Sequence, residues 1–176
     1  MQHHSRNPWV GILDPNGMPS AHYRLAPIVV YWDVENCMVP AGCDPYTIRD
    51  RISRFLRQLG YEGYIRIIAV AANIDRIPLF VRQGLHWSGI RFHHLHTHRK
   101  QASDIDIKRR IRQWMRYVRG PRNLLLISGD GGFASTLMDV EIHSHNTMVA
   151  YNEHSVSDLI SYVGYSQFAW RELLQY

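Results

Sequence analysis

The stretch that decides the fold is Ile28-Val29-Val30-Tyr31-Trp32-Asp33, a run of five apolar residues that stops at an acid. Such a run is typical of a parallel strand that is buried on both faces. Similar short runs follow at 65–71, 90–95, 124–127 and 147–151, with amphipathic stretches between them at 44–60, 77–84, 104–118 and 133–143, and a helical region at the C-terminus. This alternation predicts an α/β fold, a three-layer Rossmann-like domain with a parallel sheet flanked by helices.

The rest of the chain is compatible with one globular domain. It has 176 residues, of which 45% are hydrophobic, and it holds no apolar run long enough to span a membrane. Residues 1–27 contain four prolines and show neither helical nor strand periodicity. We therefore expect a flexible or surface-wrapped leader over residues 1–27 and the α/β domain over residues 28–176.

The charge distribution favours a polyanionic partner. The net charge is +5, and 19 of the 20 basic residues lie in residues 1–122, together with only 9 of the 15 acids. All but two of the basic residues are arginine, which binds phosphate with a planar, bidentate geometry. The two cysteines, Cys37 and Cys43, are too few for a disulfide framework. They favour an intracellular, reducing compartment, the cytoplasm first, with the mitochondrion, peroxisome or nucleus as alternatives.

Two acids stand at the ends of predicted strands. Asp33 follows the first strand directly, and Asp130 follows the run 124–127 after Ser128-Gly129. A single acid at a strand end is most often a turn residue. If the two strands are neighbours, however, both acids lie at the carboxyl edge of the sheet, where ligands of such folds bind. Gly131 and Gly132 then allow the backbone to approach a ligand closely.

A third acid lies at the start of the long helix predicted over 104–118. Asp104 shares its helical face with Ile107 and Ile111, so we expect it to point toward the sheet. Ser103 and Asp106 have capping-box spacing, which gives Asp106 a structural role as a cap. Three carboxylates at the strand ends suit a hard cation such as Mg²⁺ or Mn²⁺, which serves phosphate chemistry by activating a water.

The residues around these acids resemble a known family. The segments Val30-Tyr31-Trp32-Asp33-Val34-Glu35-Asn36-Cys37, Lys100-Gln101-Ala102-Ser103-Asp104 and Ile127-Ser128-Gly129-Asp130-Gly131-Gly132-Phe133-Ala134 look like the successive motifs of NYN domains. These domains are PIN-like ribonucleases, and the first segment is most similar to the branch of meiosis regulators and mRNA stability factors. The resemblance covers about residues 27–174.

The resemblance implies a Mg²⁺- or Mn²⁺-dependent endoribonuclease that leaves a 5′-phosphate and a 3′-hydroxyl and takes part in RNA turnover or regulation of gene expression. Asp33, Asp104 and Asp130 would be the metal carboxylates. Asn36 would orient the first loop or contact the scissile phosphate, and Ser128 would support the site. Animal members of the family also carry an acid after the second strand. Here that region reads Val70-Ala71-Ala72-Asn73-Ile74-Asp75, so Asn73 and Asp75, with Asp106, are possible accessory residues.

A basic run gives an independent indication of RNA. Residues 108–122 hold seven basic side chains and no acid, interleaved with Trp114 and Tyr117. The inner face of this helix belongs to the core, whereas a one-signed outer face gains from phosphates. An ordinary exposed helix surface is the alternative. The candidate contacts with single-stranded RNA are Arg99, Lys100, Lys108, Arg109, Arg112 and Arg116.

Two other functions remain open from the sequence. The first is a catalytically weak or inactive RNA-binding or interaction module on the same fold, because the acid after the second strand is missing. The second is a phosphatase of the haloacid-dehalogenase type. The segment Gly129-Asp130-Gly131 superficially resembles the metal-binding loop of these enzymes. No further RNA-binding module is present in the sequence, so a protein partner or a larger parent protein would supply targeting, and the oligomeric state is left open.

Overall fold

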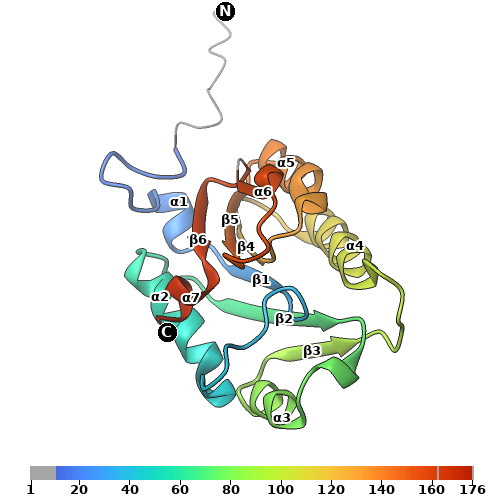
Figure 1. The fold of residues 1–176 in the computed structure, drawn as a ribbon. Helices are drawn as coiled ribbons and strands as arrows, with labels where there is room; N and C mark the ends of the chain where they lie inside the picture. The colour runs from blue at the N-terminus through green and yellow to red at the C-terminus, as the bar shows by residue number, and fades with distance from the viewer. Residues whose placement is uncertain (1–10, 162, 176) are drawn as a thin grey trace, which may run out of the picture.

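The computed structural model describes residues 11–161 and 163–175 (Figure 1). Six strands form one parallel sheet in the order β3-β2-β1-β4-β5-β6. The predicted α/β fold with a parallel sheet is confirmed, and β1 and β4 are neighbours. The strands are β1 (Ile28–Asp33), β2 (Ile65–Ala71), β3 (Arg91–His94), β4 (Asn123–Ile127), β5 (Asn146–Tyr151) and β6 (Ser166–Ala169).

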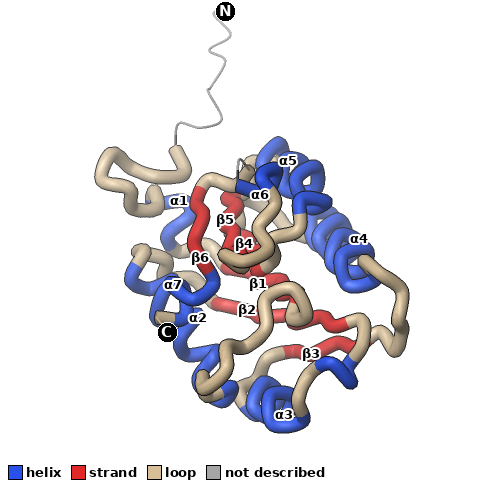
Figure 2. The backbone as a smooth tube through the Cα atoms, in the orientation of Figure 1, coloured by secondary structure: helices blue, strands red, loops and turns tan. Residues whose placement is uncertain are grey.

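Helices cover both faces of the sheet, which gives three layers (Figure 2). One face packs against α2 (Ile48–Gln58), α3 (Leu79–Trp87) and α7 (Trp170–Leu174). The other face packs against α4 (Ala102–Tyr117), α5 (Ala134–Ile142) and α6 (Asp158–Ser161). The remaining elements are α1 (Ala21–Arg24) and the 3-10 turns η1 (Pro45–Thr47), η2 (Ile74–Arg76) and η3 (Gly131–Phe133).

The alternation of side chains along β1 decides which layer meets the acid at its end. Val30 and Trp32 belong to the core on the α2 side, whereas Val29 and Tyr31 belong to the core on the α4 side. Because neighbouring residues of a strand point to opposite faces, Asp33 continues the second set. The sequence of β1 therefore directs its terminal carboxylate toward α4.

Two parts of the chain differ from the prediction. The C-terminal region, predicted to be helical, also contains the edge strand β6, a parallel partner of β5. This prediction was incomplete because four residues of mixed polarity carry no clear periodicity. In the described part of the leader, residues 11–27, the short helix α1 forms and Ile12 is only 3% exposed. Residues 1–10 of the predicted leader lie outside the described residues.

Two smaller observations concern the cysteines and the helices. Cys37 and Cys43 are both free and buried. Among the described residues, none of the helices combines the length and the apolar composition that crossing a membrane requires.

Candidate active site

Three predicted acids come together at the carboxyl edge of the sheet. Asp33 is the last residue of β1, Asp130 follows the neighbouring strand β4, and Asp104 lies in the first turn of α4. Asp33 is 3% exposed and Asp104 is 6% exposed. The prediction that Asp104 points toward the sheet agrees with this placement. We call Asp33, Asp104 and Asp130 the acidic row.

Within the acidic row, Asp104 is the middle member, because its carboxyl group is in hydrogen-bond contact with those of Asp33 and Asp130. Burial and the two acidic neighbours together raise the pKa of Asp104 to about 8. Burial also raises the pKa of Asp33 to about 6, although contacts with Asp104, Ser103 and the Asn36 backbone N–H oppose this. The contact with Asp104 lowers the pKa of Asp130. A proton held by Asp104 therefore relieves the repulsion between three carboxylates.

The donor set of the acidic row fits a hard divalent cation. The Oδ1 atom of Asp33 is buried and has no hydrogen-bond partner, although a buried carboxylate oxygen needs one. A cation would satisfy this atom and would replace the proton on Asp104. In the described parts of the chain, no group of three or more His, Cys, Asp or Glu side chains is already arranged to hold a metal ion.

Hydrogen bonds hold the loop after β1 against the loop after β4. The Oδ1 atom of Asn36 accepts a hydrogen bond from the Gly129 backbone N–H at 2.8 Å, and Asn152 Nδ2 donates to the Asn36 carbonyl at 3.0 Å. The indole N–H groups of Trp32 and Trp170 donate to the next two residues of this loop, to the carbonyls of Cys37 and Met38. Asn36 thus joins the segments that carry Asp33 and Asp130, which is the geometry of a residue that orients the first loop.

The loop after β4 fixes Asp130 through its own backbone. Asp130 Oδ1 accepts from the Gly132 N–H at 2.8 Å, and the Asp130 N–H donates to Oγ of the buried Ser128 at 3.3 Å. A Cβ atom on Gly132 would lie 3.1 Å from that Oδ1 and 3.2 Å from Lys108 Nζ, so glycine keeps this approach open. The Lys108 ammonium also lies 5.4 Å from the centre of the Phe133 ring. The sequence placed Lys108 on the RNA-binding surface, and the structure places it beside Asp130.

The predicted capping box at the start of α4 is wrong. The helix begins at Ala102, after Gln101 in a left-handed conformation, and has no side-chain cap. Ser103 contacts Asp33 instead. Asp106 accepts from Arg109 at 2.7 Å and from Arg110 at 2.5 Å. Burial raises the pKa of Asp106, but these two hydrogen bonds together hold it below its usual value.

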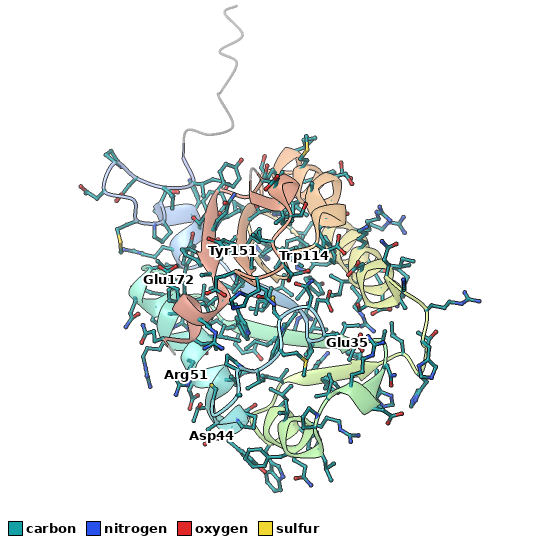
Figure 3. The ribbon with its side chains drawn as sticks, in the orientation of Figure 1. Glu35, Asp44, Arg51, Trp114, Tyr151 and Glu172 are labelled. Atoms are coloured by element: carbon teal, nitrogen blue, oxygen red, sulfur yellow. The ribbon has the colours of Figure 1, made fainter. Side chains whose placement is uncertain are left out.

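Glu35, in the loop after β1, reaches the end of β2, which is the position where animal members of the family carry an acid that this chain lacks. The Oε1 atom of Glu35 accepts from the Asn73 backbone N–H at 2.6 Å, beside β2 (Figure 3). The Asn73 side chain already makes two hydrogen bonds, since its Oδ1 atom accepts from the Asp75 N–H and its Nδ2 atom pairs with His98 Nδ1. Asp75 itself is exposed on η2. Glu35 was not among the predicted site residues, although its position two residues after Asp33 indicated that it lies near the end of the same strand.

Two cavities at this edge collect some of the predicted RNA-binding residues. A cavity of about 210 Å³ lies between Glu35, Asn73 and Ser103, and its rim carries Arg99 and Lys100. A second cavity of about 400 Å³ shares Arg99 and Lys100 and adds Asp106 and Arg109. Arg112 and Arg116 are exposed and line neither cavity. The structure thus brings Arg99, Lys100, Lys108 and Arg109 toward the acidic row but leaves Arg112 and Arg116 apart.

The parallel sheet, its strand order and the acids at its carboxyl edge define a PIN-like α/β domain. The NYN domain model matches residues 27–168, and the chain belongs to this family. The matched range begins one residue before the predicted domain and reaches β6.

The chain is similar to curated proteins named meiosis regulator and mRNA stability factor 1. It is 30% identical to the Mus musculus protein over 122 residues, which is 69% of this chain, and 26% identical to the Gallus gallus protein over 154 residues, or 86%. It spans only 7% and 8% of the length of these relatives. A crystal structure of a protein of unknown function from Vibrio parahaemolyticus has a TM-score of 0.56 and 19% identity, covering 86% of this chain and 96% of that chain. The likeness supports the fold.

Proposed function

We propose that this domain is a metal-dependent endoribonuclease that cleaves single-stranded RNA by an activated water, and that it serves RNA turnover or the regulation of gene expression. The observation that carries the proposal is the acidic row. Three carboxyl groups in contact, one with a pKa of about 8 and another with an unpartnered buried oxygen, are an arrangement that a divalent cation would stabilise.

The reaction would be hydrolysis of a phosphodiester. Asp33, Asp104 and Asp130 would hold Mg²⁺ or Mn²⁺, which supplies positive charge for the phosphoryl oxygens and lowers the pKa of a water. Hydrolysis would join the oxygen of a water to phosphorus and break the bond between phosphorus and the 3′-oxygen, while the proton that the water loses is balanced by the proton that the 3′-oxygen gains. The products carry a 5′-phosphate and a 3′-hydroxyl.

The surrounding residues would position the strand and its charges. Asn36, through its hydrogen bond to Gly129, keeps the two acid-bearing loops at a fixed spacing. Lys108, which lowers the pKa of Asp130, is placed to attract a phosphoryl oxygen beside that carboxylate. Arg99 and Lys100 line both cavities at this edge and would neutralise flanking phosphates.

The relatives support a role in RNA metabolism, since they are named as factors in mRNA stability. Because the chain spans about 7% of the mouse relative, targeting to particular RNAs is assigned to a larger parent protein or to a protein partner. An intracellular, reducing compartment is part of the same proposal. The family assignment argues against the haloacid-dehalogenase alternative.

A cleavage assay tests this function. The chain is incubated with a labelled unstructured RNA, with Mn²⁺ or with a chelator, beside Asp130→Asn and the control Asp139→Asn, which removes an exposed carboxylate from α5. We expect Mn²⁺-dependent internal cleavage by the wild type and by Asp139→Asn, with 5′-phosphate ends, and none by Asp130→Asn. Cleavage that continues in chelator, or that survives in Asp130→Asn, would contradict the proposal.

A non-catalytic RNA-binding module is the second candidate. It is favoured by Asn73, which stands where animal members of the family have an acid. RNA binding without cleavage at any Mn²⁺ concentration would select this candidate.

A further inference from the structure

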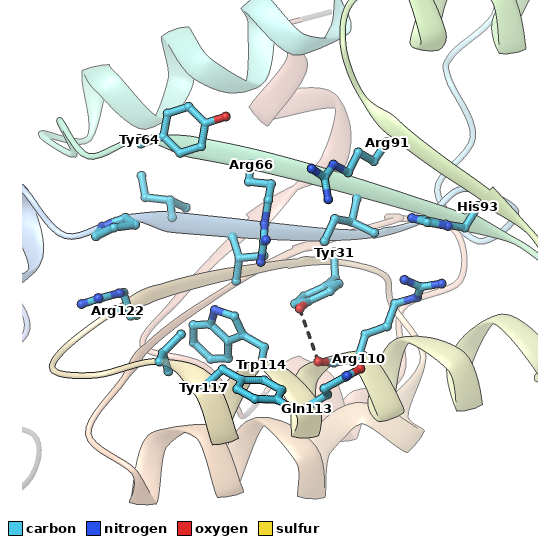
Figure 4. Close-up of a pocket in the computed structure, with 15 residues that line it drawn as sticks. Tyr31, Tyr64, Arg66, Arg91, His93, Arg110, Gln113, Trp114, Tyr117 and Arg122 are labelled. Carbon is cyan, nitrogen blue, oxygen red and sulfur yellow. Dashed lines mark hydrogen bonds between the residues drawn. The ribbon is translucent and has the colours of Figure 1, made fainter.

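A separate cavity opens on the α4 side of the sheet, beside β2 and β3 (Figure 4). In β2 the core on the α2 side takes Ile67 and Ala69, so the alternate residue Arg66 points to the α4 side. Arg91 of β3 lines the same cavity, whose volume is about 570 Å³. Figure 4 shows Arg66 extending from β2 toward α4, with Arg91 beside the strands at the same cavity. We call this cavity the arginine groove.

The lining of the arginine groove is positive and contains no acid. Arg66, Arg91, Arg110 and Arg122 all contribute to it, and neither Asp nor Glu does. Arg110 is held by Asp106, which lies outside the groove lining. In the part of the chain that the structure describes, no acidic side chain forms an ion pair with Arg66 or Arg91. Their strand positions place their Cα atoms about 8 Å apart.

The pKa of the neighbouring His93 side chain is affected by these positive charges. His93 lies between the strands and α4 in the groove. Burial lowers the pKa of His93, and Arg110 and Arg91 lower it further, whereas Asp106 opposes them in part. Grouped guanidinium groups repel one another and cannot lose their charge at any physiological pH. An anion with several negative charges is therefore the ligand that this lining favours.

Aromatic side chains stand beside these charges. Tyr117, on the last turn of α4, lines the groove and is 75% exposed. Tyr64, before β2, is 71% exposed at the other wall. Exposed rings next to phosphate-binding groups are the arrangement on which bases of single-stranded nucleic acids stack.

The arginine groove also adjoins the cavities of the candidate active site. Asp106 binds Arg109, which lines the 400 Å³ cavity, and Arg110, which lines the groove. That cavity shares Arg99 and Lys100 with the cavity next to Ser103. Along α4, at a rise of about 1.5 Å per residue, Arg110 lies roughly 9 Å beyond Asp104 and Tyr117 roughly 20 Å beyond it. Asp106, bound to both arginines, therefore lies between the arginine groove and the 400 Å³ cavity.

We propose that the arginine groove binds a segment of single-stranded RNA next to the segment held at the acidic row. Phosphates of this segment contact Arg66, Arg91 and Arg110, and a base stacks on Tyr117. The identity of the ligand as RNA rests on the proposed function, whereas the preference for a flexible polyanion with aromatic bases rests on the groove itself.

Equilibrium binding tests the phosphate contacts. An oligouridine of about 12 nucleotides is titrated in chelator, so that no cleavage occurs, and its anisotropy is followed from low to high salt. Arg66→Gln and Arg91→Gln are compared with Arg54→Gln, which removes an equal charge from an exposed position of α2 on the other side of the sheet. Each groove variant is expected to bind about fivefold more weakly at 0.1 M salt and to flatten the salt slope by about 0.7. Arg54→Gln should match the wild type.

Folding is checked in the same samples. Since the groove variants relieve repulsion at a surface, their melting temperatures are expected to equal or exceed that of the wild type. Equal losses of affinity in Arg54→Gln and the groove variants would overturn the proposal, because the groove would then contribute only to net charge. Wild-type affinity in both groove variants would overturn it as well.

A second comparison tests stacking and the source of the nucleotide. Tyr117→Ala should lose about tenfold in affinity, whereas Tyr117→Phe, which keeps the ring, should lose little. Uridine monophosphate is titrated in parallel. Binding of the mononucleotide as tight as that of the oligomer would overturn the proposal in favour of a free-nucleotide site, and weak mononucleotide binding supports a strand.

Failure of this proposal is distinguishable from failure of the proposed function. Groove-dependent binding by a chain that never cleaves RNA would refute the nuclease proposal and leave the groove standing. Metal-dependent cleavage by groove variants with unchanged RNA affinity would refute the groove and leave the nuclease standing.

Discussion

The acidic row and the arginine groove lie along one helix and gather opposite charges. The first turn of α4 brings Asp104 against Asp33 and Asp130, and two turns later Arg110 stands with Arg66 and Arg91 around a cavity. Both regions gather like charges that the fold neutralises only in part, through Lys108 beside Asp130 and through Asp106 beside Arg110. The difference is that the acidic row accepts a proton, at a pKa of about 8 for Asp104, whereas arginine keeps its charge.

Because of this difference, the two regions should respond to different solution conditions: pH and metal for one, salt for the other. Under the proposed function the acidic row would exchange its proton for a cation, and its stability would then depend on pH and on metal. The arginine groove is permanently charged, so its affinity for a polyanion depends on salt and little on pH. Under the two proposals, a divalent cation would balance the charge of the acidic row, and the phosphates of an RNA strand would balance the charge of the arginine groove.

The largest effect is expected for Asp104→Asn. This change removes the middle carboxylate of the acidic row, so cleavage should fall at least about 100-fold. The melting temperature should stay equal or rise, because repulsion with Asp33 and Asp130 disappears. Cleavage rates and thermal unfolding of the same preparation check both. A variant that loses activity together with stability would indicate that Asp104 has a structural role.

The second prediction concerns pH in the absence of metal. Folding raises the pKa of Asp33 to about 6 and that of Asp104 to about 8, so the folded chain holds protons that the unfolded chain has lost. Stability from these groups is complete below about pH 4 and is lost as pH rises toward 8. The melting temperature in chelator should fall by about 5 °C between pH 6 and pH 9.

Two conditions serve as controls for this pH dependence. Asp104→Asn should show a flatter profile between pH 6 and pH 9, since it lacks the group with the highest pKa of the row. Mn²⁺ should have the same flattening effect on the wild type. A profile of equal slope in the wild type and in Asp104→Asn would remove the acidic row as its cause.

A smaller effect is expected for Asp106→Asn, which separates the two regions. It removes the ion pairs with Arg109 and Arg110 and should cost about 1 kcal/mol of unfolding free energy, since Arg109 is largely exposed. Cleavage should be retained within a few-fold. Urea unfolding and the cleavage assay measure the two quantities. Loss of cleavage as severe as in Asp104→Asn would place Asp106 in the acidic site.

The smallest effect is a change in the titration of His93. Burial, Arg110 and Arg91 lower its pKa, so Arg91→Gln should raise that pKa toward the ordinary value. Arg54→Gln should leave it unchanged. Titration of the His93 ring by NMR measures both. An unchanged His93 pKa in Arg91→Gln would mean that the charges of the groove do not act on one another.

Much of the acidic row could be predicted because local patterns determine it. The apolar runs before Asp33 and Asp130 show where β1 and β4 end. Because these strands are parallel neighbours, both acids lie at the same edge of the sheet. The spacing of Asp104 to Ile107 and Ile111 gives its helical face without further information. These inferences need only the periods of helix and strand.

Other features depend on distant contacts that no local pattern reports. Ser103 and Asp106 have the spacing of a capping box, yet Ser103 interacts with Asp33, and Asp106 accepts hydrogen bonds from Arg109 and Arg110. The arginine groove combines residues of two strands with residues of α4. Arg66 and Arg91 look like ordinary strand residues until the structure shows where α4 lies against the sheet.

The most direct test of the account is thermal unfolding of the wild type and of Asp130→Asn over a range of Mn²⁺ concentrations. The account predicts that the melting temperature of the wild type rises with Mn²⁺ as ligand mass action requires, because the cation binds only the folded acidic row, and that Asp130→Asn does not respond. Asp139→Asn is expected to behave as the wild type does. A wild-type melting temperature that does not change at millimolar Mn²⁺ would contradict the account.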